Sequence, residues 1–154
     1  MVLHLLFLCT GNICRSPTAE GVMRKKLEEL GIHTQFKLDS AGTHGYHVGE
    51  KPDARTRQAA KKRGYNLDNL RARKLDFSDF YEFDYIFCMD EGHYFHAKDI
   101  MPDNGKAKIE LYLTYAGLDL NDVPDPYYGG QQGFENVLDL IEQASDSIIK
   151  KLGY

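Results

Sequence analysis

The sequence lacks several features that would assign it to a common class. It has only three cysteines in 154 residues, an odd number that gives no complete disulfide framework and favours a reducing compartment. It has no excess of positive charge, since its net charge is −4, which argues against broad binding to nucleic acid or anionic membranes but permits a local positive pocket. No G-x-x-x-x-G-K-[ST] pattern occurs, which excludes a P-loop nucleotide enzyme.

The longest apolar run near the N-terminus, residues 2–8, is far too short to span a bilayer. It also lacks the basic segment and the small-residue cleavage site of a signal peptide. We therefore expect a cytoplasmic protein that binds neither nucleic acid nor membranes, as a monomer or weak dimer. No repeat, low-complexity tract or linker interrupts residues 1–154, so a single domain is expected over that range.

Short apolar stretches alternate with segments of helical periodicity. We expect strands over 2–8, 35–39, 83–89 and 109–113, and helices over about 18–30, 53–63, 91–100 and 134–152. Ser16 and Pro17 suit the N-cap and first position of the first helix, Ser40 to Gly49 suits a loop, and residues 106–114 could also form a helical turn. This order predicts an α/β fold with a four-stranded parallel sheet and helices on both faces.

The segment from Phe7 to Pro17 lies between the first strand and the first helix. A loop in this place directs backbone N–H groups and the positive end of the helix dipole at one point, so it can bind an anion or stabilise a thiolate. Cys9 opens the loop, and Arg15 closes it with a planar fork that fits two phosphate oxygens. Gly11 and Asn12 tolerate the positive φ that a tight anion-binding loop needs. The segment therefore predicts a phosphate or arsenate site.

A second segment, from Pro124 to Gly129, has an acid between two prolines. Asp125 could supply a proton to a leaving group, which typically contributes about 10² to 10⁴ in rate. The residues alone also fit an ordinary surface turn that is rich in turn formers.

The loop sequence Cys9-Thr10-Gly11-Asn12-Ile13-Cys14-Arg15-Ser16 resembles the phosphate-binding loop of the low-molecular-weight protein tyrosine phosphatases. The family pattern is C-x-G-N-x-C-R-S, and every fixed position matches. The resemblance implies a cofactor-free phosphatase with Cys9 as nucleophile, Arg15 as phosphoryl clamp and Asp125 as general acid and base. It also implies that the phosphate is bound by the rest of the loop: Thr10, Gly11, Asn12, Ile13, Cys14 and Ser16. By the same resemblance, Ser16 would donate a hydrogen bond to the Cys9 thiolate, and Asn12 would hold the loop through a strained backbone.

Other segments resemble the same family along nearly the whole chain. Asp125-Pro126-Tyr127-Tyr128 matches the family's D-P-Y-Y, which implies that the two tyrosines wall a cleft for an aromatic ring. Ser40, in Asp-Ser-Ala-Gly, would brace the phosphate loop. Residues 45–49 and 52–55 resemble the bacterial-type loop at the rim of the cleft, where Tyr46 stands in place of the Trp found in many members.

The remaining cysteines and the histidines have more than one interpretation. Cys14 either forms a reversible disulfide with Cys9, as the family often does, or packs as a small buried residue. Cys88 fits the core. The histidine pairs His44 and His47, and His93 and His96, lack the further ligands of a metal site, so we expect no metal and solvated imidazoles.

Three alternatives share the fold or the loop. An arsenate reductase would need a further pair of closely spaced cysteines, and only Cys88 remains. A protein-arginine phosphatase would carry Thr at the position of Ile13. A non-catalytic phosphate or redox sensor would be expected to lack Cys9 or Asp125.

Overall fold

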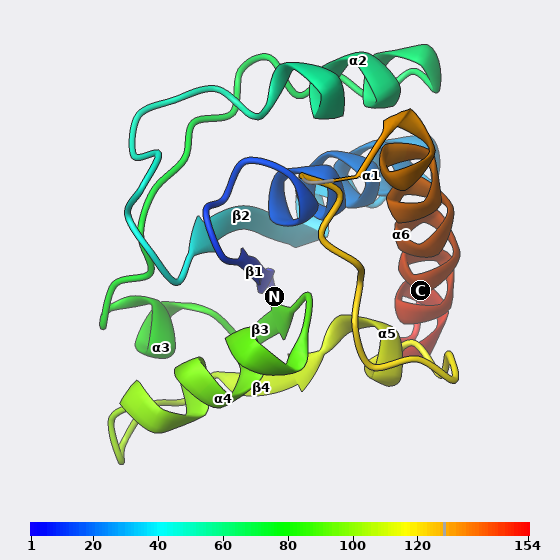
Figure 1. The fold of residues 1–154 in the computed structure, drawn as a ribbon. Coiled ribbons are helices and arrows are strands. Elements are labelled where there is room, and N and C mark those ends of the chain that lie inside the picture. Colours follow the sequence, from blue (N-terminus) through cyan, green and yellow to red (C-terminus); the bar gives the residue numbers. More distant parts are fainter. Residues whose placement is uncertain (128) are drawn as a thin grey trace.

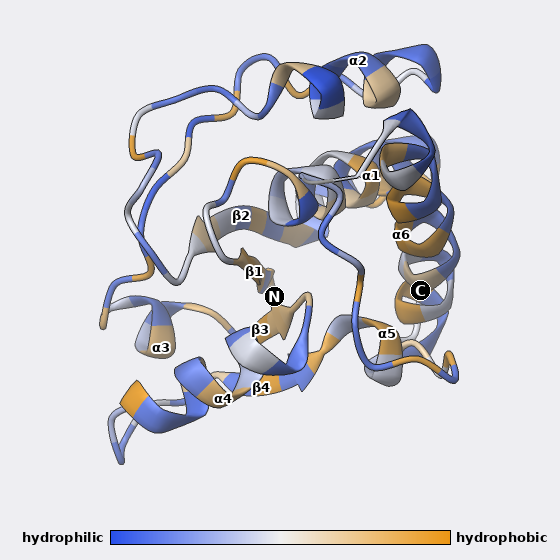
Figure 2. Cartoon of the chain, viewed as in Figure 1, coloured by the Kyte–Doolittle hydropathy of each residue, from blue (hydrophilic) through white to orange (hydrophobic). Residues whose placement is uncertain are grey.

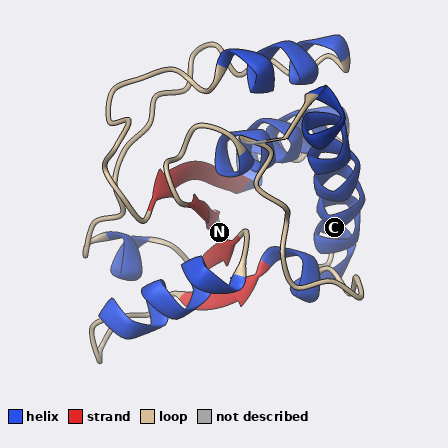
Figure 3. Ribbon diagram, viewed as in Figure 1, coloured by secondary structure: helices blue, strands red, loops and turns tan. Residues whose placement is uncertain are grey.

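The computed structural model describes residues 1–127 and 129–154 and contains one parallel sheet of four strands in the order β2-β1-β3-β4. The strands are β1 (Leu3–Cys9), β2 (Phe36–Gly42), β3 (Tyr85–Cys88) and β4 (Lys108–Leu111). Figures 1 and 3 show the strands at the centre of the molecule with helices around them. The predicted fold class is confirmed.

Two groups of helices cover the two faces of the sheet. On one side lie α1 (Arg15–Glu29), α2 (Ala54–Lys62), α5 (Tyr112–Tyr115) and α6 (Gln131–Lys151), and on the other lie α3 (Asp79–Glu82) and α4 (Glu91–Ile100) (Figure 1). A short 3-10 turn, η1 (His33–Gln35), precedes β2. No described helix has both the length and the apolar character that a membrane crossing requires.

The alternation of β1 between the two faces explains its continuous apolar sequence. Leu5 and Phe7 enter the core beneath α1 and α6, while Leu6 and Leu8 enter the core that includes Phe80 of α3. These four residues of β1 are fully buried, as expected for a strand in the middle of a parallel sheet that is covered on both faces. Figure 2 shows that hydrophobic and hydrophilic residues follow one another along α6, as expected for a helix with one buried face.

Most predicted elements are present, with differences at their ends. Helix α1 starts at Arg15 with Cys14 as its N-cap, so the prediction of Ser16 as N-cap was wrong. Strand β2 extends through Gly42, because Ser40 and Gly42 pair with Phe7 and Cys9, so the predicted loop begins later than expected. Residues 106–114 form both predicted alternatives in succession, since β4 leads directly into α5.

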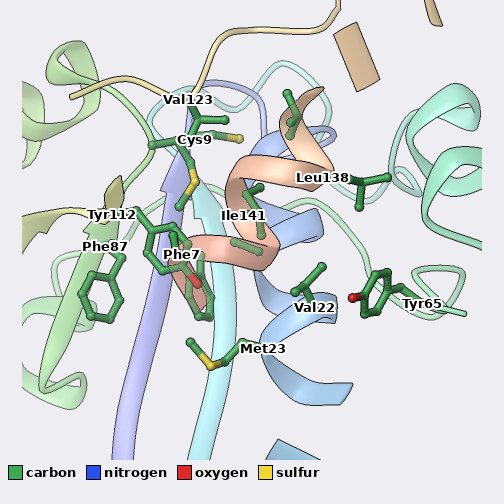
Figure 4. Close-up of a cluster of buried hydrophobic side chains, with 14 of the residues drawn as sticks. Phe7, Cys9, Val22, Met23, Tyr65, Phe87, Tyr112, Val123, Leu138 and Ile141 are labelled. Carbon is green, nitrogen blue, oxygen red and sulfur yellow. The ribbon is translucent and has the colours of Figure 1, made fainter. Parts of the chain in front are cut away.

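An aromatic cluster lies under the strand that ends at Cys9. The Phe7 ring stacks on Phe87 with centroids 6.1 Å apart and meets the edge of Tyr112 at 5.7 Å. Figure 4 shows Cys9 above Phe7 and next to Val123, with Ile141 of α6 nearby. The packing of this cluster therefore fixes the position and direction of the end of β1, which carries Cys9.

Truncation of this cluster is expected to destabilise the protein strongly. We predict that Phe7→Ala lowers the free energy of unfolding by about 3 to 5 kcal/mol, because it removes a fully buried ring and leaves a cavity. Phe77, which is 63% exposed, provides the matched control, and Phe77→Ala should change that free energy by less than about 0.5 kcal/mol. Urea unfolding followed by circular dichroism measures both, and equal losses would contradict the placement of Phe7 in the core.

Candidate active site

A cavity of about 230 Å³ opens at the carboxyl end of β1. Parallel sheets place ligand sites at this edge, because the strand ends and the following loops converge there. The cavity is lined by residues from three separate segments: Cys9, Thr10, Gly11, Ile13, Cys14, Arg15, Tyr46, His47, Asp125 and Tyr127. The structure therefore brings together the loop, the rim and the acid that the sequence predicted separately.

The loop from Cys9 to Arg15 ends where α1 begins. Cys14 is the N-cap, and no side chain within the described residues caps the first backbone N–H groups of this fifteen-residue helix. Uncapped N–H groups and the positive end of the helix dipole favour an anion at this point. Cys9 is 3% exposed at the bottom of the cavity, and its Sγ lies 3.0 Å from Ser16 Oγ.

Asn12 holds the loop open from behind. Its φ is +58°, the one positive value outside glycine among the described residues, and its side chain is buried. The amide nitrogen donates to Ser16 Oγ at 2.8 Å and to Ser40 Oγ at 3.0 Å, and Oδ1 accepts from the backbone N–H of Arg73 at 3.0 Å. The resemblance implied that Asn12 holds the loop and that Ser16 bonds the Cys9 thiolate, and their side chains lie in those places, outside the cavity lining. Their predicted part in phosphate binding stays a prediction.

The directions of these hydrogen bonds orient the hydroxyl of Ser16. Because Ser16 Oγ accepts from Asn12, its own proton can donate to Cys9 Sγ. Ser40 likewise accepts from Asn12 and donates to Glu20 Oε1 at 2.7 Å. Glu20 is buried, and its desolvation raises the pKa of its carboxyl despite the bonds from Ser40 and Arg24. The brace predicted for Ser40 therefore acts through Asn12.

Gly42 lets β2 pass close to the loop. A Cβ at this position would lie 2.6 Å from the Thr10 carbonyl oxygen and 3.2 Å from the Asn12 nitrogen, which no side chain could accommodate without moving the loop. Past Gly42, the backbone N–H groups of Thr43 and His44 donate to the carbonyls of Cys9 and Thr10. The rim of the cavity is thus tied directly to the loop.

Arg15 is held in a fixed position. It is 4% exposed, and its Nη1 donates to Asp90 Oδ2 at 2.7 Å and to the Val123 carbonyl at 3.0 Å. Its Nη2 faces the cavity side, 3.7 Å from Asp125 Oδ2. Nη1 therefore donates to groups of the protein, and Nη2 remains directed at the site.

Asp125 lies at the mouth of the cavity with its side chain 44% exposed. Its Oδ1 accepts the backbone N–H of Tyr127 at 2.9 Å, a local turn that holds the carboxyl in place. The segment is anchored by Val123, whose N–H donates to the Met89 carbonyl at the end of β3. Asp125 and Cys9 thus face the same space from different segments of the chain.

Aromatic side chains form the walls. Tyr46, which is 70% exposed, and Tyr127, which is 38% exposed, stand at the rim. Arg55 donates to the Tyr127 carbonyl at 3.1 Å and lies over its ring. The other predicted wall residue, Tyr128, lies outside the described residues.

The cysteines and histidines differ in part from expectation. Cys9, Cys14 and Cys88 are free thiols, and burial raises the pKa of Cys14 to about 12. Cys88 is fully buried, as expected for a core residue. The expectation of solvated histidines was wrong for His93, which is 3% exposed and contacts the loop.

Several residues of the site were not predicted from the sequence. Asp90, His93 and Val123 all contact Arg15. His47, which lines the cavity, lies within the rim segment 45–49 but was given no role of its own. Asp90 and His93 directly follow the apolar stretch that contains β3, so their place after a central strand was a signal for the site that the sequence interpretation did not use. Nothing in the sequence indicates that the carbonyl of Val123 would accept from Arg15.

Comparisons with known proteins agree with this geometry. Residues 4–154 match the family described as low molecular weight phosphotyrosine protein phosphatase. This chain belongs to that family. A low molecular weight protein-tyrosine-phosphatase of Streptomyces coelicolor is 43% identical over 97% of this chain and 93% of its own.

Solved structures of related proteins share the fold. A protein tyrosine phosphatase from Entamoeba histolytica superimposes with a TM-score of 0.92 at 44% identity, over 97% of this chain and 96% of its own. A Drosophila arginine phosphatase superimposes with a TM-score of 0.91 at 30% identity, over 97% and 98%. The same fold therefore occurs in a protein named as a tyrosine phosphatase and in one named as an arginine phosphatase.

Substitution of Asn12 should separate the two ways in which it supports the loop. We predict that Asn12→Gly and Asn12→Ala both weaken inorganic phosphate binding about tenfold or more, because both lose the hydrogen bonds that hold the loop. Asn12→Ala should lower the free energy of unfolding by a further 1 kcal/mol or so, since alanine is strained at positive φ and glycine is not. Competitive inhibition and urea unfolding measure the two effects, and equal stabilities would contradict a role for the backbone conformation.

Proposed function

We propose that this protein hydrolyses phosphotyrosine in proteins through a covalent phosphocysteine on Cys9. The observation that carries the proposal is the single cavity that holds a buried thiol, an anchored arginine and an exposed carboxyl. The family assignment supports the same reaction. Cys9 is the nucleophile, Arg15 binds the phosphoryl oxygens, and Asp125 transfers the proton.

In the first step the Cys9 thiolate attacks phosphorus and the bond to the tyrosine oxygen breaks. The hydroxyl of Ser16 stabilises the thiolate by its hydrogen bond, and the uncapped N–H groups of α1 stabilise the charge of the phosphoryl oxygens. Asp125, in its acid form, protonates the departing phenolate. Its position 3.7 Å from Arg15 Nη2 keeps it beside the phosphoryl group.

In the second step a water molecule loses a proton to the Asp125 carboxylate and attacks phosphorus. The bond from phosphorus to Cys9 Sγ breaks, inorganic phosphate forms and the thiolate is restored. No electron transfer occurs, and the same residue serves as acid and then as base. The side chains described here account for each step without a cofactor.

The depth of the cavity supports phosphotyrosine as the substrate. Cys9 lies at the bottom, while Tyr46 and Tyr127 stand exposed at the rim. A phosphoserine ester is shorter, so its phosphorus would stop above the thiol. Ile13 adds an apolar wall that suits a phenyl ring better than a guanidinium, which argues against phosphoarginine.

The reversible disulfide between Cys9 and Cys14 stays a prediction. Both thiols are buried, and the high pKa of Cys14 makes it a poor nucleophile on its own. A disulfide would therefore form only after a peroxide has oxidised Cys9 to a sulfenic acid and has itself been reduced; the Cys14 sulfur then attacks Cys9 Sγ, and the hydroxyl group leaves as water.

Phosphate release from matched phosphotyrosine, phosphoserine and phosphoarginine peptides tests the proposed substrate. We expect release from the phosphotyrosine peptide alone, in the presence of reductant and chelator, and no release by Cys9→Ser. Cys9→Ser should still bind inorganic phosphate, because Arg15 and the loop remain. Faster release from the phosphoarginine peptide would instead assign the chain to the other substrate class.

The role of Asp125 predicts a dependence on the leaving group. Asp125→Asn should lower kcat/KM, which reports the first step and not the hydrolysis of the phosphocysteine, by about 10² to 10⁴ for aryl phosphates with poor leaving groups and much less for 4-nitrophenyl phosphate, whose phenolate needs no proton. A series of substituted phenyl phosphates measures this slope, with Asp122→Asn as the matched control at an exposed aspartate of the same segment. Equal losses across the series would refute Asp125 as the acid.

A further inference from the structure

His93 is a buried imidazole at the edge of the phosphate loop to which the two chemical steps above give no role. It is the third residue of α4 and is 3% exposed. Each of its ring nitrogens meets a different part of the site. Nδ1 faces the start of α4, and Nε2 faces Thr10 and Arg15.

The contacts at the start of α4 determine which ring nitrogen carries the proton. Asp90 donates its backbone N–H to His93 Nδ1 at 3.1 Å, while its Oδ1 accepts the backbone N–H of His93 at 3.0 Å. This reciprocal capping box uses Nδ1 as an acceptor. The neutral imidazole therefore carries its proton on Nε2.

Nε2 lies 2.8 Å from Thr10 Oγ1, so it donates to that hydroxyl. Arg15 Nη2 lies 3.5 Å from the same oxygen, to which it donates, and 3.4 Å from Nε2, which it contacts without a hydrogen bond because both nitrogens carry hydrogen in this tautomer. The Thr10 oxygen thus has two donors directed at it, which leaves its own proton for an acceptor in the cavity that Thr10 lines. Thr10 directly follows Cys9, so an oxygen of a phosphoryl group bound at Cys9 is the acceptor within reach.

The surroundings of His93 keep it neutral. Burial lowers the pKa of His93 to about 4, and the positive charge of Arg15 acts in the same direction, while Asp90 and Asp125 oppose the shift. A protonated ring would gain the Asp90 carboxylate, whose Oδ1 lies 3.2 Å from Nδ1, but it would lose the bond from the Asp90 backbone N–H and place a positive charge against Arg15. The geometry of the site therefore depends on the neutral form.

We propose that His93 is a positioning residue of the phosphate site, which turns the Thr10 hydroxyl into a donor to the phosphoryl group and packs against the guanidinium of Arg15. The proposal rests on the function proposed for Cys9 and Arg15. It adds a third element, α4, to the set that binds the phosphoryl group, through a side chain that itself never touches the substrate.

His93→Asn provides a selective test. The Oδ1 of asparagine occupies nearly the place of Nδ1, so it preserves the acceptor for the backbone N–H of Asp90 and with it the capping box. No atom remains at the position of Nε2. We expect inorganic phosphate to bind five- to tenfold more weakly and kcat to fall by a similar factor, with an unchanged Tm. His96→Asn, on the same helix, is the control and should leave all three quantities unchanged.

A double-mutant cycle with Thr10→Val shows whether His93 acts through the hydroxyl. In the Thr10→Val background, His93→Asn should change phosphate binding by less than about twofold. Independent, multiplied effects of the two substitutions would overturn the proposal, as would unchanged phosphate binding in His93→Asn or a loss that only accompanies a lowered Tm. Phosphate binding can also be measured in Cys9→Ser, so a failure of the nucleophile assignment would be recognised separately.

Discussion

The site depends on a loop that directs its backbone N–H groups at the place where an anion would bind. Such a loop is unfavourable in free energy, because the partial positive charges of its converging N–H groups repel one another and Asn12 adopts a left-handed conformation. The side chain of Asn12 offsets this cost by joining Ser16, at the start of α1, to two segments that are distant in the sequence, at Ser40 and the backbone of Arg73. The loop is therefore shaped before the substrate arrives, which is the condition for electrostatic stabilisation of a transition state.

The positive charge of Arg15, which is buried beside this loop, also needs partners within the protein. An isolated buried guanidinium would be unfavourable, so Asp90 and the Val123 carbonyl accept from one side of the fork. The ends of β1 and β3 place these partners, because Asp90 follows β3 and Val123 is bonded to Met89. The parallel sheet thus brings Cys9, Arg15 and the partners of Arg15 to one edge, where we propose that Cys9 is the nucleophile and Arg15 the anion clamp. The segment that carries Asp125 closes the site above them.

Much of this arrangement could be predicted from the sequence. The buried run of β1, the loop that follows it and the stripe of α6 carry strong local signals, and the motif around Cys9 identifies the family by itself. Side-chain contacts between distant segments carry no such signal. The hydrogen bond from Arg15 to the Val123 carbonyl arises from the bond between Val123 and Met89, and the burial of His93 arises from the packing of α4 against the loop. Both depend on tertiary geometry that no periodicity encodes.

The most direct test of this account is to identify the covalent intermediate. 4-Nitrophenyl phosphate, whose leaving group needs no proton from Asp125, is mixed with the Asp125→Asn variant, the reaction is quenched in acid within the first turnover, and the digested protein is mapped by mass spectrometry. The account predicts one phosphoryl group on the peptide that contains Cys9 and none in the matched Cys9→Ser sample. Release of phosphate with no phosphoryl group on Cys9 at any time would contradict the proposed covalent mechanism.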